Sequence, residues 1–330
     1  MPKYKARASE YGAFSSALLT GWIILSAAGI VYARWKGIPP WAALPVLAAF
    51  LLEYSFYLLA GFQSAREGLA LLVPGLRLPL ATALSALPPY LAYSIGTGQF
   101  HWQALTLLTA LAFALAFWFT VLPASALTDI GYVLFMAGLV LGKFFGRIYP
   151  DPFPGLHVEI LGQLALIHIA AIVMLVQRPV PGIGFGFLPN RKEWKIGIRH
   201  FLYFLPVGFP LAMALGAMRF DLGQFQLWKA AGTFFGILWV VALSEEFLFR
   251  GVLQQWIGAW TGRPQLAILL TALLFGAVHL PFRAFPNWKF ALVAAVAGWF
   301  YGRAYQQASS IRASMVAHAC VVTLWRSLFS

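Results

Sequence analysis

The stretch from Trp102 to Val121 reads WQALTLLTALAFALAFWFTV and contains no charged residue. A helix rises about 1.5 Å per residue, so this stretch forms a helix of roughly 30 Å, the thickness of the hydrocarbon core of a bilayer. The uncharged sequence extends further, because no Asp, Glu, Lys or Arg occurs between Arg77 and Asp129. Residues 96–99, GTGQ, are typical of a turn and divide it into two predicted crossings, Pro79–Ile95 and Trp102–Val121.

The composition extends this prediction to the whole chain. Of the 330 residues, 61% are hydrophobic and 10% are charged, against roughly 45–50% and 25% in soluble domains. The mean hydropathy is +0.78. These values exclude an ordinary soluble protein and a largely disordered one. The single cysteine, Cys320, excludes an internal disulfide and any site with several thiolate ligands.

Apolar segments recur along the chain and predict an all-α, polytopic transmembrane helix bundle of about eleven spans. The first segment, Ala13–Ala33, is too long for the apolar region of a signal peptide, so it is predicted to be retained as a helix. The remaining eight predicted spans are Trp41–Gly61, Ala126–Leu141, Ile160–Gln177, His200–Met218, a span from near Trp228 to beyond Arg250, Gln265–Pro281, Trp288–Tyr305 and Ile311–Phe329.

The clearest domain boundary is the stretch from Arg178 to Arg199. It is rich in proline and glycine, and it ends in a basic cluster. The sequence therefore predicts two parts: residues 1–195, with about six spans and no assigned role, and residues 196–330, which contain the functional motifs. The basic cluster consists of Arg191, Lys192, Lys195 and Arg199.

The net charge is +13, from 23 Lys and Arg against 10 Asp and Glu. The basic residues lie between apolar segments, as in loops that face anionic lipid headgroups. The lipid bilayer is therefore an expected partner and nucleic acid is not. The distribution of Lys and Arg predicts an integral multi-pass protein of the plasma or inner membrane with a cytoplasmic N-terminus. Four basic residues fall on the opposite side in this orientation: Arg34, Lys36, Lys143 and Arg147.

Residues 243–251, LSEEFLFRG, place two carboxylates and an arginine within an apolar segment. An ionisable group at the bilayer centre costs at least about 2.5–3.5 kcal/mol, so each one needs a partner or a function. Glu246 and Arg250 are four residues apart and are predicted to pair on one helix face. Glu245 lies about 100° around the helix, so it is free to face a different cavity and to act as a general base.

Two histidines lie on later apolar segments, His279 in FGAVHLP (275–281) and His318 in SMVAHACVV (314–322). Two carboxylates and two histidines on three neighbouring helices could converge on one water. Glu245 would then remove a proton from the water, one histidine would hold it and later serve the leaving amine, and the other would donate to the oxyanion. Each feature alone is more often structural, as an ion pair or a packed histidine. Their occurrence together on separate spans favours a site for peptide hydrolysis.

These motifs resemble those of the CAAX protease and bacteriocin-processing enzyme family, which includes the type II CAAX prenyl endopeptidases and their bacterial relatives. Glu245-Glu246 with Arg250 matches EExxxR, Phe275 with His279 matches FxxxH, and His318 is similar to the histidine of the third motif. The similarity covers about residues 200–330. It implies an intramembrane glutamate-type endopeptidase that needs no cofactor or metal and cleaves a membrane-anchored or prenylated substrate. Glu245 would be the general base, His279 its partner on the water, and His318 part of the oxyanion hole, with Glu246 and Arg250 completing the first motif.

One position departs from the family pattern. The family usually has Asn four residues after the third-motif histidine, where this chain has Val322. Ser314 and Trp325 are the nearest donors predicted on the same helix face. The departure keeps open a catalytically inactive membrane scaffold or immunity-type interaction protein with the same fold. A transporter that uses Glu245 and Glu246 as proton carriers is a third hypothesis, against which the lack of an evident inverted repeat argues.

Other catalytic mechanisms fit the sequence less well. The chain has no HExxH motif, although its glutamates and histidines keep a metallopeptidase open as an alternative. No serine stands in a Gly-x-Ser-Gly context, Asp129 is the only aspartate near a span, and Cys320 lies on a different helix face from His318. Glu53 and His168, within the second and sixth predicted spans, are expected to form interhelical hydrogen bonds rather than a functional site.

Overall fold

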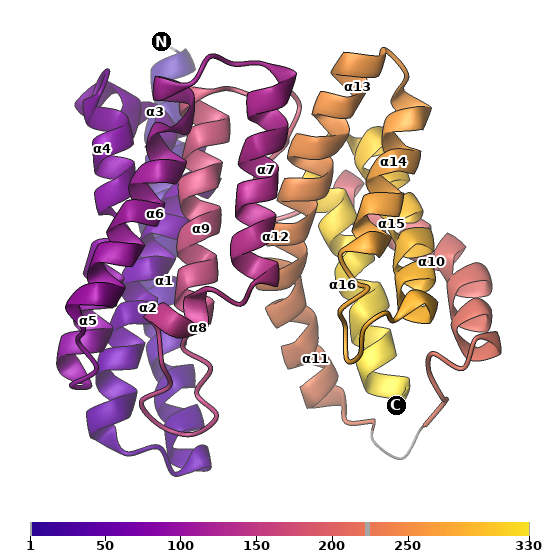
Figure 1. The fold of residues 1–330 in the computed structure, drawn as a ribbon, viewed down its shortest axis with the longest axis horizontal. Coiled ribbons are helices and arrows are strands. Elements are labelled where there is room, and N and C mark those ends of the chain that lie inside the picture. The colour runs from indigo at the N-terminus through magenta and orange to yellow at the C-terminus, as the bar shows by residue number, and fades with distance from the viewer. Residues whose placement is uncertain (1, 222–224, 330) are drawn as a thin grey trace. The chain divides into compact units, whose positions relative to one another are not determined.

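The structure, a computed structural model, describes residues 2–221 and 225–329. Within these residues every regular element is a helix, apart from an isolated antiparallel bridge between Phe220 and Phe329. The chain divides into two compact units, Met1–Pro179 and Val180–Ser330 (Figure 1). We call them the N-terminal unit and the C-terminal unit. The all-helical fold predicted from the apolar pattern is therefore confirmed.

In the N-terminal unit, α2 packs closely against several neighbouring helices. Ala42, Ala49 and Ala60 on α2 are fully buried, because small side chains allow neighbouring helices to approach closely. α2 packs against α1, α5 and α9. The helices are α1 (Pro2–Lys36), α2 (Pro40–Gly61), α3 (Gln63–Leu72), α4 (Arg77–Leu84), α5 (Leu87–Gly96), α6 (Trp102–Val121), α7 (Ala126–Leu141), α8 (Phe145–Ile148) and α9 (Ile160–Ile172), which continues into a π-helical segment, η1 (Val173–Gln177).

Two buried polar pairs connect helices of this unit. His168 on α9 lies with Nδ1 2.5 Å from Glu53 Oε1 on α2, and both side chains are almost fully buried. Each of these residues thus forms an interhelical hydrogen bond, as the sequence predicts, and the structure shows that they form it with each other. At the end of η1, Arg178 Nη2 lies 3.1 Å from Asp129 Oδ2 on α7. Each buried carboxylate therefore has a cationic or hydrogen-bonding partner on another helix.

In the C-terminal unit, one long helical segment, Leu227–Thr261, carries the first motif. It is built from α11 (Leu227–Gly236), η2 (Ile237–Ala242), α12 (Leu243–Glu246), η3 (Phe247–Gln254) and α13 (Gln255–Thr261), where η2 and η3 are π-helical. π-helical turns widen the backbone and occur often at functional sites. The other helices are α10 (Arg191–Ala214), α14 (Pro264–Ala277), α15 (Trp288–Ala308) and α16 (Ile311–Leu328).

Two glycines allow the helices of this unit to pack tightly. A Cβ at Gly276 of α14 would lie 2.5 Å from the carbonyl oxygen of Ala291 and 2.7 Å from Ala295 Cβ, both on α15. A Cβ at Gly197 of α10 would lie 2.6 Å from the carbonyl oxygen of Ala313 on α16. The missing side chains bring α15 and α16, which carry Gly298 and His318, close to the remaining helices.

The predicted number of spans is not confirmed. Every predicted span overlaps a helix. Among the residues that the structure describes, however, six helical segments are long and apolar enough to cross a membrane, or seven if α3 and the α4–α5 segment count as one bent span. α7 and α14 are apolar but short, with 16 and 14 residues. α15 and α16 are long enough but carry several polar side chains. The predicted span Pro79–Ile95 is interrupted at residues 85–86, between α4 and α5.

The two units divide at Pro179, earlier than the boundary at residue 195 that the sequence suggested. The proline- and glycine-rich residues 180–190 look like a linker in the sequence, but they pack as extended chain on the C-terminal unit. The backbone N–H of Ile311 donates to Ile183 O at 3.1 Å, and Ser310 Oγ donates to Gly184 O at 3.1 Å. The separate roles assigned to the two parts of the chain remain predictions.

The close contact at Gly276 yields a stability prediction. We expect Gly276→Ala to lower the free energy of unfolding of the C-terminal unit by about 1–3 kcal/mol, because a methyl group there overlaps the α15 backbone. Gly258→Ala is the matched control, since its Cβ would make only an ordinary 3.7 Å contact with Ala267. It should leave stability unchanged or raise it by roughly 0.5–1 kcal/mol. Denaturant unfolding in detergent, followed by tryptophan fluorescence, measures both; equal stability of the two variants would contradict the prediction.

Candidate active site

The two adjacent glutamates occupy different environments. Glu246 and Arg250 are fully buried, and Arg250 Nη1 donates to Glu246 Oε1 at 3.1 Å. Glu245 keeps 30% of its side chain exposed. The predicted pairing of Glu246 with Arg250, and the separation of Glu245 from that pair, are confirmed. The cause is geometric, since residues four apart share a helix face and adjacent residues do not.

Arg250 anchors the site to α14 and α15. Its second amino group, Nη2, donates to the carbonyl oxygen of Gly298 at 3.0 Å. Its guanidinium carbon lies 4.5 Å from the centre of the Phe275 ring and 5.4 Å from that of Tyr301. Such cation–π contacts gain strength where water is excluded. A Cβ at Gly298 would lie 3.2 Å from Arg250 Nη2, so the absent side chain at this position makes room for the guanidinium.

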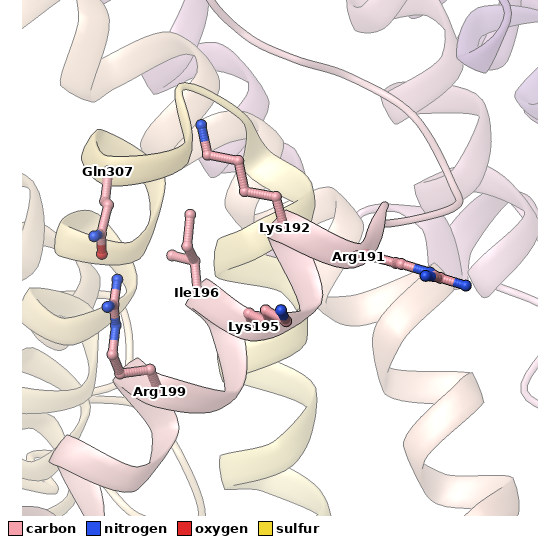
Figure 2. A pocket seen from close by; sticks show the side chains of 6 residues that line it. All are labelled: Arg191, Lys192, Lys195, Ile196, Arg199 and Gln307. Atoms are coloured by element: carbon pink, nitrogen blue, oxygen red, sulfur yellow. The ribbon is translucent and has the colours of Figure 1, made fainter.

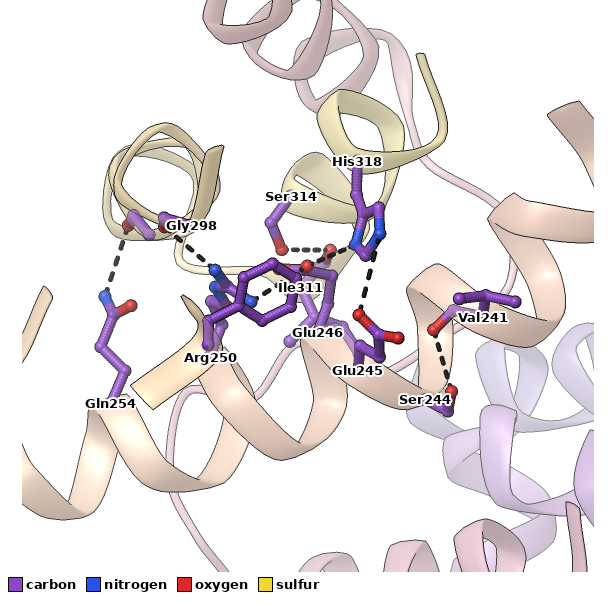
Figure 3. Close-up of polar contacts among 12 residues, drawn as sticks. Val241, Ser244, Glu245, Glu246, Arg250, Gln254, Gly298, Ile311, Ser314 and His318 are labelled. Carbon is purple, nitrogen blue, oxygen red and sulfur yellow. Dashed lines mark hydrogen bonds and ion pairs between the residues drawn. The ribbon is translucent and has the colours of Figure 1, made fainter. Parts of the chain in front are cut away.

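His318 on α16 connects the two glutamates (Figure 3). Its Nδ1 lies 2.8 Å from Glu246 Oε1, within hydrogen-bonding distance, and its Nε2 lies 3.8 Å from Glu245 Oε2. The imidazole ring stacks on Tyr301 with centroids 4.7 Å apart, and the Phe275 ring meets it edge-on at 5.8 Å. The aromatic walls and the Glu246 contact together fix the orientation of the ring.

This geometry restricts the protons of His318. Glu246 already accepts a hydrogen bond from Arg250, so its carboxylate is an acceptor and His318 Nδ1 must carry a proton. The second nitrogen, Nε2, then faces Glu245. A separation of 3.8 Å is too long for a direct hydrogen bond, and Glu245 Oε2 is itself buried without a hydrogen-bond partner. Since 30% of the Glu245 side chain is exposed, a water would have to reach this carboxylate through its other oxygen.

His279 lies just beyond the end of α14 and is half-buried. Its Nδ1 is 2.7 Å from the carbonyl oxygen of Phe275, so Nδ1–H donates there and Nε2 is left as an acceptor. Within the described residues, His279 makes no ion pair or hydrogen bond with Glu245, Glu246 or His318. It approaches them through the Phe275 ring, which lies 4.8 Å from the His279 ring. Four of the five predicted site residues thus form one connected network, and His279 borders it.

Two residues of the site could not be singled out from the sequence. Gly298 supplies the carbonyl that accepts from Arg250, and Tyr301 supplies the surface on which His318 stacks. Both lie on α15, three residues apart, in the run GWFY (298–301). A glycine within an apolar helix is a weak signal of close packing, and an isolated tyrosine gives none.

The two donors suggested as substitutes for the missing asparagine differ in availability. Ser314 is fully buried, and its hydroxyl donates to the carbonyl oxygen of Ile311 at 2.8 Å, so it is already engaged. Trp325 is half-buried and packs on Phe290 at 4.7 Å, and Phe290 in turn packs on His279 at 5.6 Å. Of the two, only Trp325 lies in the aromatic cluster that borders the site.

A cluster with metal-like spacing occurs elsewhere, in the loop before α9. In the described part of the chain, Asp151, His157 and Glu159 are the residues whose ligand atoms all lie within 4.8 Å of one another. Asp151 and His157 are exposed and Glu159 is half-exposed, so solvent already satisfies their polar groups. The cluster belongs to the N-terminal unit and shares no residue with the motifs. The predicted absence of a metal from the glutamate site remains a prediction.

Part of the C-terminal unit is similar in sequence to known proteins. Residues 227–324 match the family model described as Type II CAAX prenyl endopeptidase Rce1-like. The chain is also 33% identical over 79 residues to the uncharacterized protein YpbD of Bacillus subtilis (strain 168), across 24% of this chain and 36% of the relative. The chain thus spans about a third of the length of this curated relative. No solved structure matches the chain. The resemblance is confirmed for residues 227–324, which contain all five predicted site residues and support a CAAX-protease type of membrane protein.

The buried ion pair yields a prediction about stability. We expect Arg250→Ala to lower the free energy of unfolding by about 3–5 kcal/mol, because it leaves the carboxylate of Glu246 buried without its cation. The double variant Arg250→Met with Glu246→Gln should recover most of this loss, since no net charge stays buried and the amide oxygen still accepts from His318. Arg326→Ala, at an exposed position of α16, is the control and should change stability by less than about 0.5 kcal/mol. Denaturation in detergent micelles tests all three; a double variant as unstable as Arg250→Ala would refute the explanation.

Proposed function

We propose that the C-terminal unit is an intramembrane endopeptidase that hydrolyses a peptide bond of a membrane-anchored substrate with a water activated by Glu245. The observation that carries the proposal is the position of His318, 2.8 Å from Glu246 and 3.8 Å from Glu245. This arrangement places the partly exposed carboxylate of Glu245 beside the imidazole of His318. The buried carboxylate of Glu246 fixes the orientation of that imidazole. The match of residues 227–324 to the type II CAAX prenyl endopeptidases supports the same reaction class.

Both ring nitrogens of His318 face a carboxylate, Nδ1 that of Glu246 and Nε2 that of Glu245. A proton on Nε2 would allow His318 to donate to an oxyanion, the role that the resemblance implies for this residue.

The hydrolytic step follows from these positions. Glu245 accepts a proton from the water, and His279, whose Nδ1–H is held by Phe275 O, accepts the second water hydrogen at Nε2. The water oxygen attacks the peptide carbonyl carbon, and His318 donates to the oxyanion that forms. When the carbon–nitrogen bond breaks, the proton taken up by Glu245 passes to the leaving amine. Glu246 and Arg250 contact none of the reacting atoms in this scheme and keep His318 in place.

The surroundings of the helix that carries Glu245 suit a substrate that arrives from the bilayer. On α11 and η2, earlier in the same helical segment, four large apolar side chains are exposed. Exposed apolar side chains on a membrane helix face lipid. We therefore propose a membrane-anchored peptide or protein, lipid-modified in the manner implied by the family, as the substrate class. The exposed side chains are Leu227, Trp228, Phe235 and Trp239.

A basic cavity at the start of α10 supports the proposed orientation in the membrane. The cavity has a volume of about 790 Å³, and its wall contains no acidic side chain (Figure 2). Glu193, the acidic residue of this helix turn, is paired instead with Arg312 at 2.8 Å. By the positive-inside rule, we propose that this end of α10 and the N-terminus face the cytoplasm, in the plasma or inner membrane. The lining residues are Arg191, Lys192, Lys195, Ile196, Arg199 and Gln307.

The alternative of an inactive scaffold or immunity-type protein rests mainly on Val322. No contact among the described residues adds support for it, and four of the five motif residues form the network that hydrolysis requires.

The role of Glu245 yields the central test. We expect Glu245→Gln to reduce cleavage by at least about 10²–10⁴-fold, because a carboxamide cannot accept the proton of the water. Its stability should stay close to that of the wild type, since the Glu245 side chain is partly exposed and forms no hydrogen bond with another described residue. Substrates are found by comparing the membrane proteomes of cells that express the wild type or the variant, and purified protein in liposomes then gives the rate.

Glu246→Gln serves as the matched neighbour. It removes the charge that faces Arg250 and His318, so it should lower stability as well as activity.

Cleavage by the wild type should persist in a strong chelator; loss of activity that Zn²⁺ restores would favour the metallopeptidase alternative. Full activity of folded Glu245→Gln would overturn the assignment of the base.

The valine at position 322 yields a gain-of-function prediction. Val322 lies one helical turn after His318, where an asparagine could add a second oxyanion donor. Since one such donor is worth a factor of roughly 10²–10³, we expect Val322→Asn to raise kcat with little change in KM. Trp325→Phe tests whether the indole N–H of Trp325 donates to the oxyanion in place of the missing asparagine. If it does, this substitution should lower kcat. Unchanged kcat in both variants and in His318→Ala would exclude an oxyanion hole on this helix face.

A further inference from the structure

Three side chains of the N-terminal unit form a continuous chain of hydrogen bonds. Glu53 Oε1 on α2 lies 2.5 Å from His168 Nδ1 on α9, and His168 Nε2 lies 2.8 Å from Ser85 Oγ. Ser85 occupies the break between α4 and α5. Carboxylate, imidazole and hydroxyl thus follow in the order and at the distances of the triad that activates a serine nucleophile. None of these residues takes part in the glutamate site.

The carboxylate sets the direction of proton transfer. Glu53 accepts the Nδ1 proton of His168, so the neutral imidazole presents an unprotonated Nε2 to the Ser85 hydroxyl. The hydroxyl also lies 2.6 Å from the carbonyl oxygen of Thr82, which holds the side chain in position. Rotation about the Cβ–Oγ bond brings the serine proton to Nε2. His168 is then able to act as the general base for Ser85.

The three side chains become more exposed in the order Glu53, His168, Ser85, as catalysis by the serine requires. Glu53 is fully buried, His168 is 2% exposed, and Ser85 is half-buried. A carboxylate that only orients a histidine needs no access, whereas a nucleophile must reach its substrate. One oxygen of Glu53, Oε2, is buried with no hydrogen-bond partner among the described residues. Such an oxygen is costly for a purely structural bond, and it adds stabilisation when His168 becomes charged during a reaction.

The surface around Ser85 is apolar. Leu80 and Leu84, on the helix that leads to Ser85, are 41% and 42% exposed. An uncharged acyl group with a long hydrocarbon chain fits these surroundings, and a charged or polar substrate does not.

We propose that Ser85, His168 and Glu53 form a second hydrolytic site, which cleaves carboxylic esters of long acyl chains presented by the membrane. Ser85 Oγ attacks the ester carbonyl carbon while its proton passes to His168 Nε2. The carbon–oxygen bond of the ester breaks, and the leaving alcohol takes that proton. Water then attacks the acyl-serine, gives its proton to His168, and releases the carboxylic acid as Ser85 recovers its hydrogen. Glu53 is a positioning residue that stabilises the imidazolium.

A fluorophosphonate with a long alkyl chain tests the nucleophile directly. It transfers its phosphonyl group to an activated serine oxygen and releases fluoride. We expect full-length protein in detergent or liposomes to be labelled at Ser85, as located by peptide mass spectrometry. Ser85→Ala should abolish the label, and His168→Ala and Glu53→Gln should each slow labelling at least about 100-fold. Para-nitrophenyl esters should be hydrolysed with a kcat/KM that rises with acyl chain length.

Two controls separate this proposal from the others. Ser94→Ala removes a fully buried hydroxyl on α5 outside the triad and should be labelled at the wild-type rate. Glu245→Gln disables the proposed endopeptidase and should also leave labelling unchanged, so either proposal can fail without the other. Labelling of the wild-type protein tests whether Ser85 is an activated nucleophile even if a variant does not fold. Folded wild-type protein that is unlabelled, or labelled on a residue other than Ser85, overturns the proposal.

Discussion

The need to keep an arginine charge inside an apolar helix bundle determines the architecture of the C-terminal unit. Arg250 is fully buried, and three features contact its guanidinium group: the carboxylate of Glu246, the carbonyl of Gly298 and the ring of Phe275. These partners come from three different helices. The glycines of α14 and α15 therefore help to stabilise the arginine charge. They allow the helices to pack closely, and this packing brings a backbone carbonyl and an aromatic ring to the guanidinium.

Both units contain a buried glutamate bonded to a histidine, but they balance the charge differently. In the C-terminal unit, Glu246 has Arg250 as a permanent counter-ion, so His318 is free to use its second nitrogen elsewhere. In the N-terminal unit, Glu53 has the imidazole of His168 as its hydrogen-bond donor, and the polar chain ends at a neutral hydroxyl. The first arrangement places the second nitrogen of the histidine opposite another carboxylate, whereas the second places it opposite a hydroxyl.

Much of the fold follows from the sequence, because apolar length and charge spacing are local properties. The segment Trp102–Val121 was located to the residue, and the pairing of Glu246 with Arg250 follows from helical spacing alone. The number of spans does not follow, since a helix such as α15 is stabilised by packing against α14 and α10 rather than by its hydropathy. Ser85 lies in an uncharged stretch without a motif. Its role depends on contacts with α2 and α9, to which no local pattern points.

The position of His318 explains why two adjacent glutamates are useful. One carboxylate alone would pair with Arg250 and contact one nitrogen of the histidine. With Glu246 bonded to Nδ1 and Glu245 opposite Nε2, both nitrogens of His318 face a carboxylate. In the proposed reaction Glu245 takes up a proton from water, so its negative charge disappears as the oxyanion forms. The 3.8 Å separation therefore places the proposed base next to the proposed oxyanion donor.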